Sequence, residues 1–201
     1  DPGYLAAREI ARGPVIGIAE AAFHVASIIS TRFSVVTTLA RTKIICEHLL
    51  QIHGFEHQCR KVRASGLEVL ELEETGMAAC RDIVEECRRA VIEDEVGAIV
   101  LGCAGMADLA DHIQNEIGVP VVEGVTAATK MIEAIAGLRL GTSKIGDLAY
   151  PLPKKLSGSV RHLEIGDGYF HDVVYFVKGI VDRKRILEDS LHFFAELGAL
   201  A

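Results

Sequence analysis

The sequence lacks several features that would each assign it to a class. It contains no run of about 18 apolar residues, the length of a membrane-spanning helix, which excludes a transmembrane protein. Its 21 Lys and Arg residues are scattered and the formal net charge is −7, so the basic surface required for DNA or RNA binding is missing. Its five cysteines form no CxxC pair, which argues against a disulfide framework or a zinc ribbon. It starts at Asp1 with neither an initiating Met nor a secretory signal, and we interpret it as a piece of a longer protein or a processed product.

What is present indicates a globular protein of the cytoplasm. Half of the 201 residues are hydrophobic and 24% are charged, a balance that favours a packed core over disorder. Free cysteines in odd number fit a reducing compartment. We expect no metal site, because His48 and His53 do not have the i, i+4 spacing of zinc-binding helices.

The periodicity of apolar residues predicts an α/β fold, with a parallel sheet flanked by helices. From Pro14 to Leu138, short apolar runs alternate with longer stretches of helical period. Strands are predicted at residues 14–19, 33–38, 58–64, 97–103 and 119–123, and helices at residues 20–29, 41–53, 75–94, 108–117 and 124–138. The strand at 58–64 is polar on one face, which places it near an edge of the sheet.

Cys103 is the strongest candidate for a chemical role. In open α/β sheets, ligands bind beyond the carboxyl ends of the strands. Cys103 ends the most apolar predicted strand and precedes small residues and a helix. The amino-terminal field of that helix and its N–H groups would favour a thiolate suited to proton transfer. The alternative is a small buried core residue, and the residue pattern alone leaves both interpretations open.

Two other strand ends carry weaker candidates. Thr37 and Thr38 offer hydroxyls for a carbonyl or ureido group, or they are a β-branched pair next to a helix cap. Glu123 and Gly124 offer a carboxylate and backbone amides, although a helix cap is the simpler interpretation. The remaining thiols are interpreted as structural: Cys46, Cys59, Cys80 and Cys87.

Four segments together resemble the hydantoin/allantoin racemases of the aspartate/glutamate racemase superfamily: residues 14–21, 35–38, 102–106 and 119–124. The resemblance extends from Asp1 to about Gly158, and residues 143–151 and 155–158 are similar to the ending of the allantoin racemases. It implies two α/β lobes, of which this chain would hold one flavodoxin-like, Asp/Glu racemase-like lobe, with the other lobe largely missing.

The resemblance also implies a reaction on a small hydantoin-type substrate, with allantoin preferred because of that ending. In such racemases one cysteine thiolate removes the proton next to a ring carbonyl, and a second thiol returns a proton to the opposite face. No cofactor or metal takes part. Cys103 matches the second of these cysteines. The implied substrate-binding residues are Thr37, Thr38, Gly102, Ala104, Gly105 and Gly124.

The start of the chain departs from the family pattern. The family's first cysteine lies just ahead of an Asp-Pro-Gly motif, and the chain begins with that motif at Asp1, so we expect this cysteine and the upstream half of the first lobe to be absent. Two alternatives follow: a folded lobe without catalysis, or a decarboxylase or isomerase of the same superfamily that works with a single cysteine. Apolar surface left by the absent lobe would favour a homo-oligomer.

The expected domains follow from the same resemblance. They are residues 1–13, a remnant of the first lobe; residues 14–138, the racemase-like lobe; residues 139–158, a family-like segment; and residues 159–201, a tail without a counterpart in the family. Within the tail, a strand is predicted at residues 173–177 and an amphipathic helix at residues 180–197.

Overall fold

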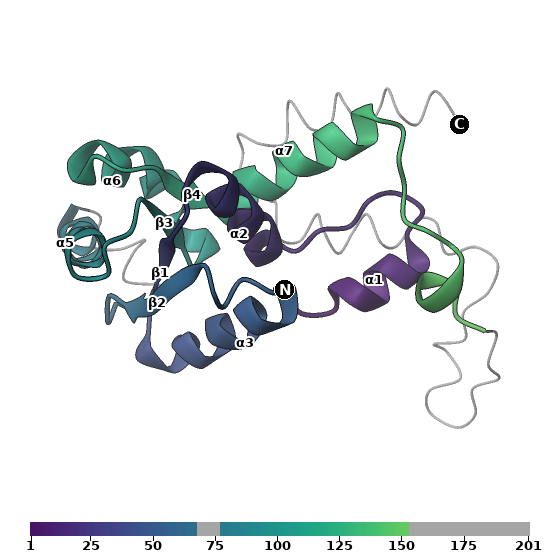
Figure 1. The fold of residues 1–201 in the computed structure, drawn as a ribbon, viewed down its shortest axis with the longest axis horizontal. Coiled ribbons are helices and arrows are strands. Elements are labelled where there is room, and N and C mark those ends of the chain that lie inside the picture. The colour runs from purple at the N-terminus through teal and green to yellow at the C-terminus, as the bar shows by residue number, and fades with distance from the viewer. Residues whose placement is uncertain (68–76, 153–201) are drawn as a thin grey trace. The chain divides into compact units, whose positions relative to one another are not determined.

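A computed structural model of the chain describes residues 1–67 and 77–152 (Figure 1). At its centre is a four-stranded parallel sheet with the strand order β2-β1-β3-β4. The strands are β1 (Phe33–Thr37), β2 (Cys59–Ala64), β3 (Ala98–Leu101) and β4 (Val121–Glu123). The predicted α/β class, a parallel sheet flanked by helices, is confirmed.

Helices cover both faces of the sheet. One face packs against α2 (Ile18–Ile29), α3 (Lys43–His53) and α7 (Gly124–Gly137), and the other against α5 (Met77–Glu93) and α6 (Ala110–Ile117). The short 3-10 helices are η1 (Ala40–Thr42), η2 (Ala104–Leu109) and η3 (Gly146–Leu148), and a further helix is α1 (Tyr4–Ile10). Among the residues that the structure describes, no helix combines the length and apolar character needed to cross a bilayer.

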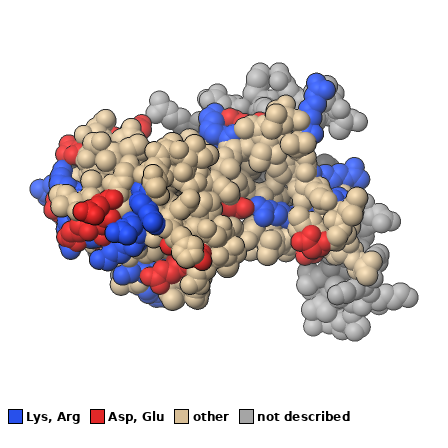
Figure 2. Space-filling model, viewed as in Figure 1, with Lys and Arg blue, Asp and Glu red and all other residues tan. Residues whose placement is uncertain are grey.

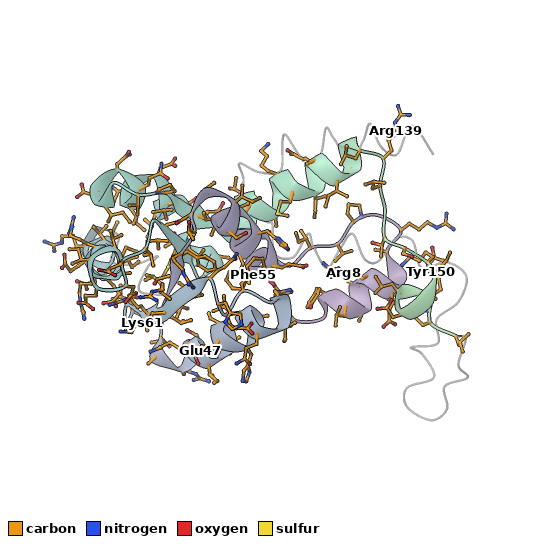
Figure 3. The ribbon with its side chains drawn as sticks, in the orientation of Figure 1. Arg8, Glu47, Phe55, Lys61, Arg139 and Tyr150 are labelled. Atoms are coloured by element: carbon orange, nitrogen blue, oxygen red, sulfur yellow. The ribbon has the colours of Figure 1, made fainter. Side chains whose placement is uncertain are left out.

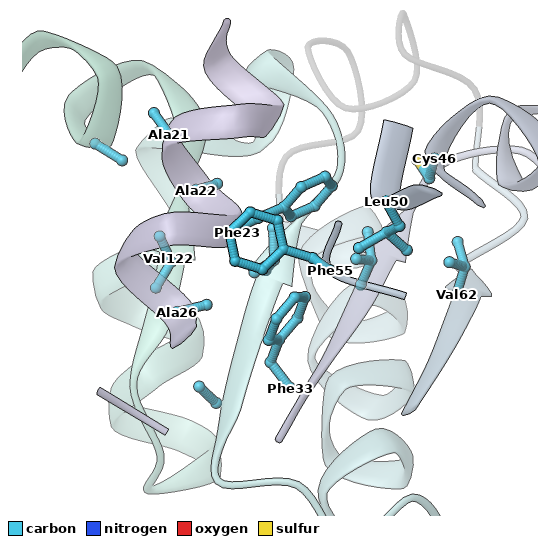
Figure 4. Close-up of a cluster of buried hydrophobic side chains, with 14 of the residues drawn as sticks. Ala21, Ala22, Phe23, Ala26, Phe33, Cys46, Leu50, Phe55, Val62 and Val122 are labelled. Carbon is cyan, nitrogen blue, oxygen red and sulfur yellow. The ribbon is translucent and has the colours of Figure 1, made fainter. Parts of the chain in front are cut away.

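The central strand β1 is buried on both faces, as its apolar sequence requires. Phe33 and Val35 join the cluster under α2 and α3, whereas Val36 joins the cluster under α5. In the first cluster the ring of Phe23 lies 5.9 Å from the rings of both Phe33 and Phe55, centroid to centroid (Figure 4). These aromatic contacts fix α2 and the end of α3 to the sheet, so that the strand ends are held on a rigid core.

The predicted strand at residues 14–19 is wrong, because α2 begins at Ile18 and Gly17 is its N-cap. The backbone N–H groups of Ala19 and Glu20 donate to the two carboxylate oxygens of Asp1, each at 3.1 Å, and are therefore not available to a sheet. A short apolar run does not by its periodicity distinguish a strand from an extended segment that enters a helix.

The other four predicted strands and the five predicted helices are present with shifted ends. The α-helix predicted from residue 108 begins at Ala110, and the 3-10 helix η2 precedes it. The part of the helix predicted at 75–94 that precedes Met77 lies outside the described residues, as do the strand predicted at 173–177 and the helix predicted at 180–197.

Strand β2 lies at an edge of the sheet as predicted, yet its Arg63 is buried rather than solvated. The Arg63 guanidinium donates to both oxygens of Asp94, at 2.7 and 2.6 Å, and also to Glu86 and Glu93 at 3.1 and 2.7 Å. Ser34 of β1 donates to the same Asp94 carboxylate at 2.8 Å. We call these five residues the Arg63 cluster; it fastens the edge strand to β1 and α5.

Charges around the Arg63 cluster are paired at the surface as well. Arg88 and Arg89 of α5 form ion pairs with Glu85 and Glu86 at 2.9 and 3.0 Å. Figure 2 accordingly shows acidic and basic side chains intermixed where α5 and β2 lie. Exposed pairs of this kind contribute at most about 1 kcal/mol each, so the buried part of the cluster dominates.

The chain divides into two compact units. The first contains Asp1–Tyr4 and Gly13–Thr142, and the second contains Leu5–Arg12 and the chain from Ser143 onward. In the second unit the Lys144 ammonium donates to the carbonyls of Arg8 and Glu9 at 2.5 and 3.2 Å, near the end of α1. Figure 3 labels Arg8 on this helix. A cation at the carboxyl end of a helix compensates its unpaired carbonyls. The predicted domain limits at residues 13, 138 and 158 stay a prediction.

Candidate functional site

The carboxyl ends of β1, β3 and β4 lie at one edge of the sheet because the strands are parallel. Val36 pairs with Leu101, and Leu101 pairs with Glu123. The N–H of Gly102 donates to the Val36 carbonyl at 2.8 Å and extends this ladder by one residue beyond β3. The register therefore brings together the three strand ends that the sequence singled out.

Cys103 lies at the margin of the core. All four residues of β3 are buried, Cys103 itself is half-buried against the cluster under α5, and Gly102, Ala104 and Gly105 around it are exposed. Its backbone is extended, and its carbonyl accepts from the N–H of Met106 at 3.0 Å. The strand thus delivers a thiol to a stretch of small, exposed residues where a ligand can approach the backbone.

The helix predicted beyond this thiol, from residue 108, begins as the α-helix α6 at Ala110. The six residues between Cys103 and α6 form the 3-10 helix η2, whose N-cap is Cys103. Its first turn closes with a hydrogen bond from the Met106 N–H to the Cys103 carbonyl. The helix that starts at Cys103 is therefore a 3-10 helix, and a role for a helix amino terminus in favouring the thiolate stays a prediction.

The other four thiols are in apolar surroundings. Burial raises the pKa of Cys59 and of Cys87 to about 12, and burial is also the main cause that raises the pKa of Cys46 and of Cys80. These thiols are protonated at neutral pH, which fits their interpretation as structural residues. Within the described ranges, no group of three His, Cys, Asp or Glu side chains could hold a metal ion.

Thr37 and Thr38 are both buried, with 1% and 3% of their surface exposed. The Thr37 hydroxyl lies 2.9 Å from the Thr42 hydroxyl and 3.4 Å from the Gly102 carbonyl oxygen. The Thr42 hydroxyl in turn donates to the Leu39 carbonyl at 2.7 Å. The Thr42 hydroxyl thus holds the Thr37 hydroxyl in place, and the Thr37 hydroxyl also lies near the carbonyl of Gly102, the residue before Cys103.

Sequence reasoning missed Thr42. The signal was indirect: Thr42 lies in the first turn of the helix predicted at residues 41–53, and in the structure it is the N-cap residue of α3. Its side chain makes no capping hydrogen bond to that helix and turns toward Thr37 and Leu39 instead. Only the three-dimensional structure shows that the hydroxyl belongs to the strand-end site.

Two glycines permit the close packing at this edge. A Cβ atom on Gly102 would lie 2.9 Å from the Cβ of Thr37, and a Cβ atom on Gly124 would lie 2.6 Å from the Ile18 carbonyl oxygen. Any larger residue at either position must displace a neighbour. Gly124 is buried against α2, and the role of Gly124 and of the other predicted residues in substrate binding stays a prediction.

Glu123 caps α7, as the simpler interpretation of the sequence held. Its carboxylate oxygens accept from the N–H groups of Val125 and Thr126 at 2.7 and 2.6 Å. A carboxylate that already accepts two backbone hydrogen bonds at a helix amino terminus is engaged in structure. Glu123 therefore has a structural role at this edge of the sheet.

Comparisons with known proteins bear on what this edge does. A family model described as Asp/Glu/Hydantoin racemase matches residues 1–132. The hydantoin racemase of Rhizobium meliloti is 54% identical over 158 residues, which are 79% of this chain and 66% of that protein. The solved allantoin racemase from Klebsiella pneumoniae is 55% identical with a TM-score of 0.76, over 81% of this chain and 66% of that one. The solved allantoin racemase from Pseudomonas fluorescens is 45% identical with a TM-score of 0.75, over 79% of this chain and 67% of that one. The chain thus spans about two thirds of the length of these relatives.

Proposed function

Because this chain belongs to the Asp/Glu/hydantoin racemase family, we propose that it carries the Cys103 half of a cofactor-independent racemase of allantoin or another 5-substituted hydantoin. The observation that carries the proposal is the half-buried Cys103 thiol at the end of β3, among exposed small residues. Its relatives are named hydantoin and allantoin racemases, which supports a ring of this class as the substrate.

The proposed step is a proton transfer at the ring carbon next to a carbonyl. The Cys103 thiolate takes the proton and becomes a thiol, and the electron pair of the broken C–H bond moves into the carbonyl to give a planar enolate. An acid on the opposite face, either a protein side chain or a water molecule, returns a proton to the same carbon, and the stereochemistry inverts. The balance requires no oxidant, reductant or cofactor.

The surroundings of the other thiols argue against them as the base. Burial raises the pKa of each of these four cysteines, so each holds its proton at neutral pH. Cys103 is supported by its position, directly after β3 and beside the exposed residues Gly102, Ala104 and Gly105.

We place the reaction in the cytoplasm, since the odd number of free thiols suits a reducing compartment. Residues 14–138 would form the racemase-like lobe, and self-association stays a prediction.

The test follows the optical rotation of one enantiomer of a 5-substituted hydantoin at neutral pH, against the spontaneous loss in buffer. We expect the protein to accelerate the loss, Cys103→Ser to return it to the buffer rate, and Cys59→Ser to leave the acceleration unchanged. Cys59 is the matched control because it is also half-buried but lies at the start of β2, at the edge of the parallel sheet opposite to Cys103. A wild-type rate equal to that of buffer refutes the proposed function. An unimpaired Cys103→Ser variant refutes the assignment of the base.

A further inference from the structure

We propose that Thr42 is a positioning residue for this site. It draws the proton of the Thr37 hydroxyl toward itself, so that the Gly102 carbonyl next to Cys103 remains available to a ring N–H of the substrate. This inference rests on the proposed function for its ligand. Its structural part, the direction of the hydroxyl protons, rests only on the contacts among Leu39, Thr37, Thr42 and Gly102.

Counting protons gives the direction of these hydrogen bonds. A hydroxyl has one proton to donate and can accept at its lone pairs. The Thr42 hydroxyl donates to the Leu39 carbonyl at 2.7 Å, so at its 2.9 Å contact with Thr37 it must accept. The single proton of Thr37 therefore serves the 2.9 Å contact rather than the Gly102 carbonyl at 3.4 Å, which is near the limit of a hydrogen bond.

The Gly102 carbonyl is placed to recognise one group of a hydantoin, the N1–H of the ring. Gly102 is exposed and directly precedes the proposed base Cys103. In a hydantoin the ring nitrogen N1 carries a hydrogen and is bonded to the reacting carbon, C5. An acceptor one residue from the base can therefore hold N1–H while the thiolate reaches the hydrogen on C5. The site would in this way favour ureide rings that carry N1–H over rings that are alkylated there.

The experiment compares Thr42→Val, which keeps the side-chain shape without the hydroxyl, with Thr42→Ser, which keeps the hydroxyl. Thr129→Val is the matched control, because the Thr129 hydroxyl donates to a carbonyl of its own helix, that of Val125, at 2.9 Å. In Thr42→Val the Thr37 proton loses its partner and turns to Gly102. We expect the ¹³C chemical shift of the Gly102 carbonyl to change in ligand-free Thr42→Val. It should remain at the wild-type value in Thr42→Ser and in Thr129→Val.

Kinetics supply the second readout. For a 5-substituted hydantoin with N1–H, Thr42→Val should raise KM about two- to tenfold, the range of one neutral hydrogen bond, with kcat nearly unchanged. For the N1-methyl analogue the same variant should leave KM unchanged. Thr42→Ala serves as the second variant where Thr42→Val does not fold.

The two readouts separate the possible failures. An unmoved Gly102 resonance in Thr42→Val, or an equal rise of KM for both substrates, overturns the inference. If wild-type protein racemises no hydantoin, the proposed function fails, and the Gly102 resonance still decides the direction of the hydroxyl protons. A moved resonance together with a KM effect confined to the N1–H substrate supports both.

Discussion

Strand β1 carries a hydroxyl near each of its ends, and the two have opposite surroundings. At Ser34 the hydroxyl donates to Asp94 inside the Arg63 cluster, where the Arg63 guanidinium makes hydrogen bonds to three different carboxylates. At Thr37 the hydroxyl belongs to a hydrogen-bonded series in which the hydroxyl protons are fewer than the oxygen acceptors. The Ser34 end, which we call the saturated end, stabilises the fold. The Thr37 end leaves the Gly102 carbonyl as an acceptor for a ligand.

Electrostatics strengthen this difference. Burial alone would raise the pKa of the Asp94 carboxyl, but hydrogen bonds from Arg63 and Ser34 outweigh burial and hold that pKa below its usual range. The hydrogen bonds to Asp94 likewise raise the pKa of the Arg63 guanidinium against its burial. Both groups are therefore charged at neutral pH and each depends on the other. The Thr37 end contains only neutral donors and acceptors, so its disruption costs less stability.

Removing Arg63 tests the saturated end and has the largest expected effect. Arg63→Met leaves Asp94 charged and buried without its main partner, so the free energy of unfolding should fall by about 3–5 kcal/mol. Urea denaturation measures it. The control Arg89→Met removes an arginine whose side chain is 53% exposed, and it should cost less than about 1 kcal/mol. Equal losses in the two variants would contradict the special role of the cluster.

Crowding the Thr37 end should have an intermediate effect. In Gly102→Ala the new methyl group would meet the Cβ of Thr37 at 2.9 Å, so we expect about 1–3 kcal/mol of destabilisation and a displaced Thr37. Gly137→Ala is the matched control at the end of α7, where a Cβ atom meets nothing within 4 Å; it should be neutral or stabilising by up to about 1 kcal/mol. Thermal unfolding of the two variants and of wild type measures these changes in stability. A neutral Gly102→Ala would show that the strand ends are more loosely packed than described.

Acid should affect the Ser34 end alone, and this is the smallest effect. Because the folded pKa of Asp94 lies below the unfolded value of about 3.9, its contribution is present above that value and is lost as pH falls through the folded pKa. Ser34→Ala removes one of the donors that lower this pKa, so the acid-dependent loss of stability should be smaller than in wild type and should be complete at a higher pH. Thr37→Val should leave the size of this loss unchanged. Stability measured from pH 6 down to pH 2 checks both, and an identical loss in Ser34→Ala would count against the cluster.

Much of this architecture could be predicted from the sequence, because local patterns determine it. The apolar run of β3, the helical stripe of α5 and the meeting of the carboxyl ends of β1 and β3 at one edge follow from periodicity and from the parallel topology. The predicted strands extended one residue beyond the end of β1 and two residues beyond the end of β3.

The rest depends on partners far away in the sequence. Arg63 alternates along β2 like a solvated residue, but its carboxylate partners Asp94 and Glu86 lie 31 and 23 residues away. The segment before α2 was interpreted as a strand because its capping group, Asp1, is 18 residues from Ala19. Thr42 was missed because an N-cap position does not reveal that the hydroxyl turns toward β1.

Whether Cys103 moves the proton can be decided by proton NMR of one enantiomer of a 5-substituted hydantoin in D₂O, with wild type and with Cys103→Ser. We expect wild-type protein to replace the hydrogen on C5 by deuterium faster than buffer does, and Cys103→Ser to exchange it at the buffer rate. Chiral analysis of the same samples shows whether the deuterium enters with inversion, as protonation from the opposite face requires. Undiminished deuterium incorporation by Cys103→Ser would show that Cys103 is not the base.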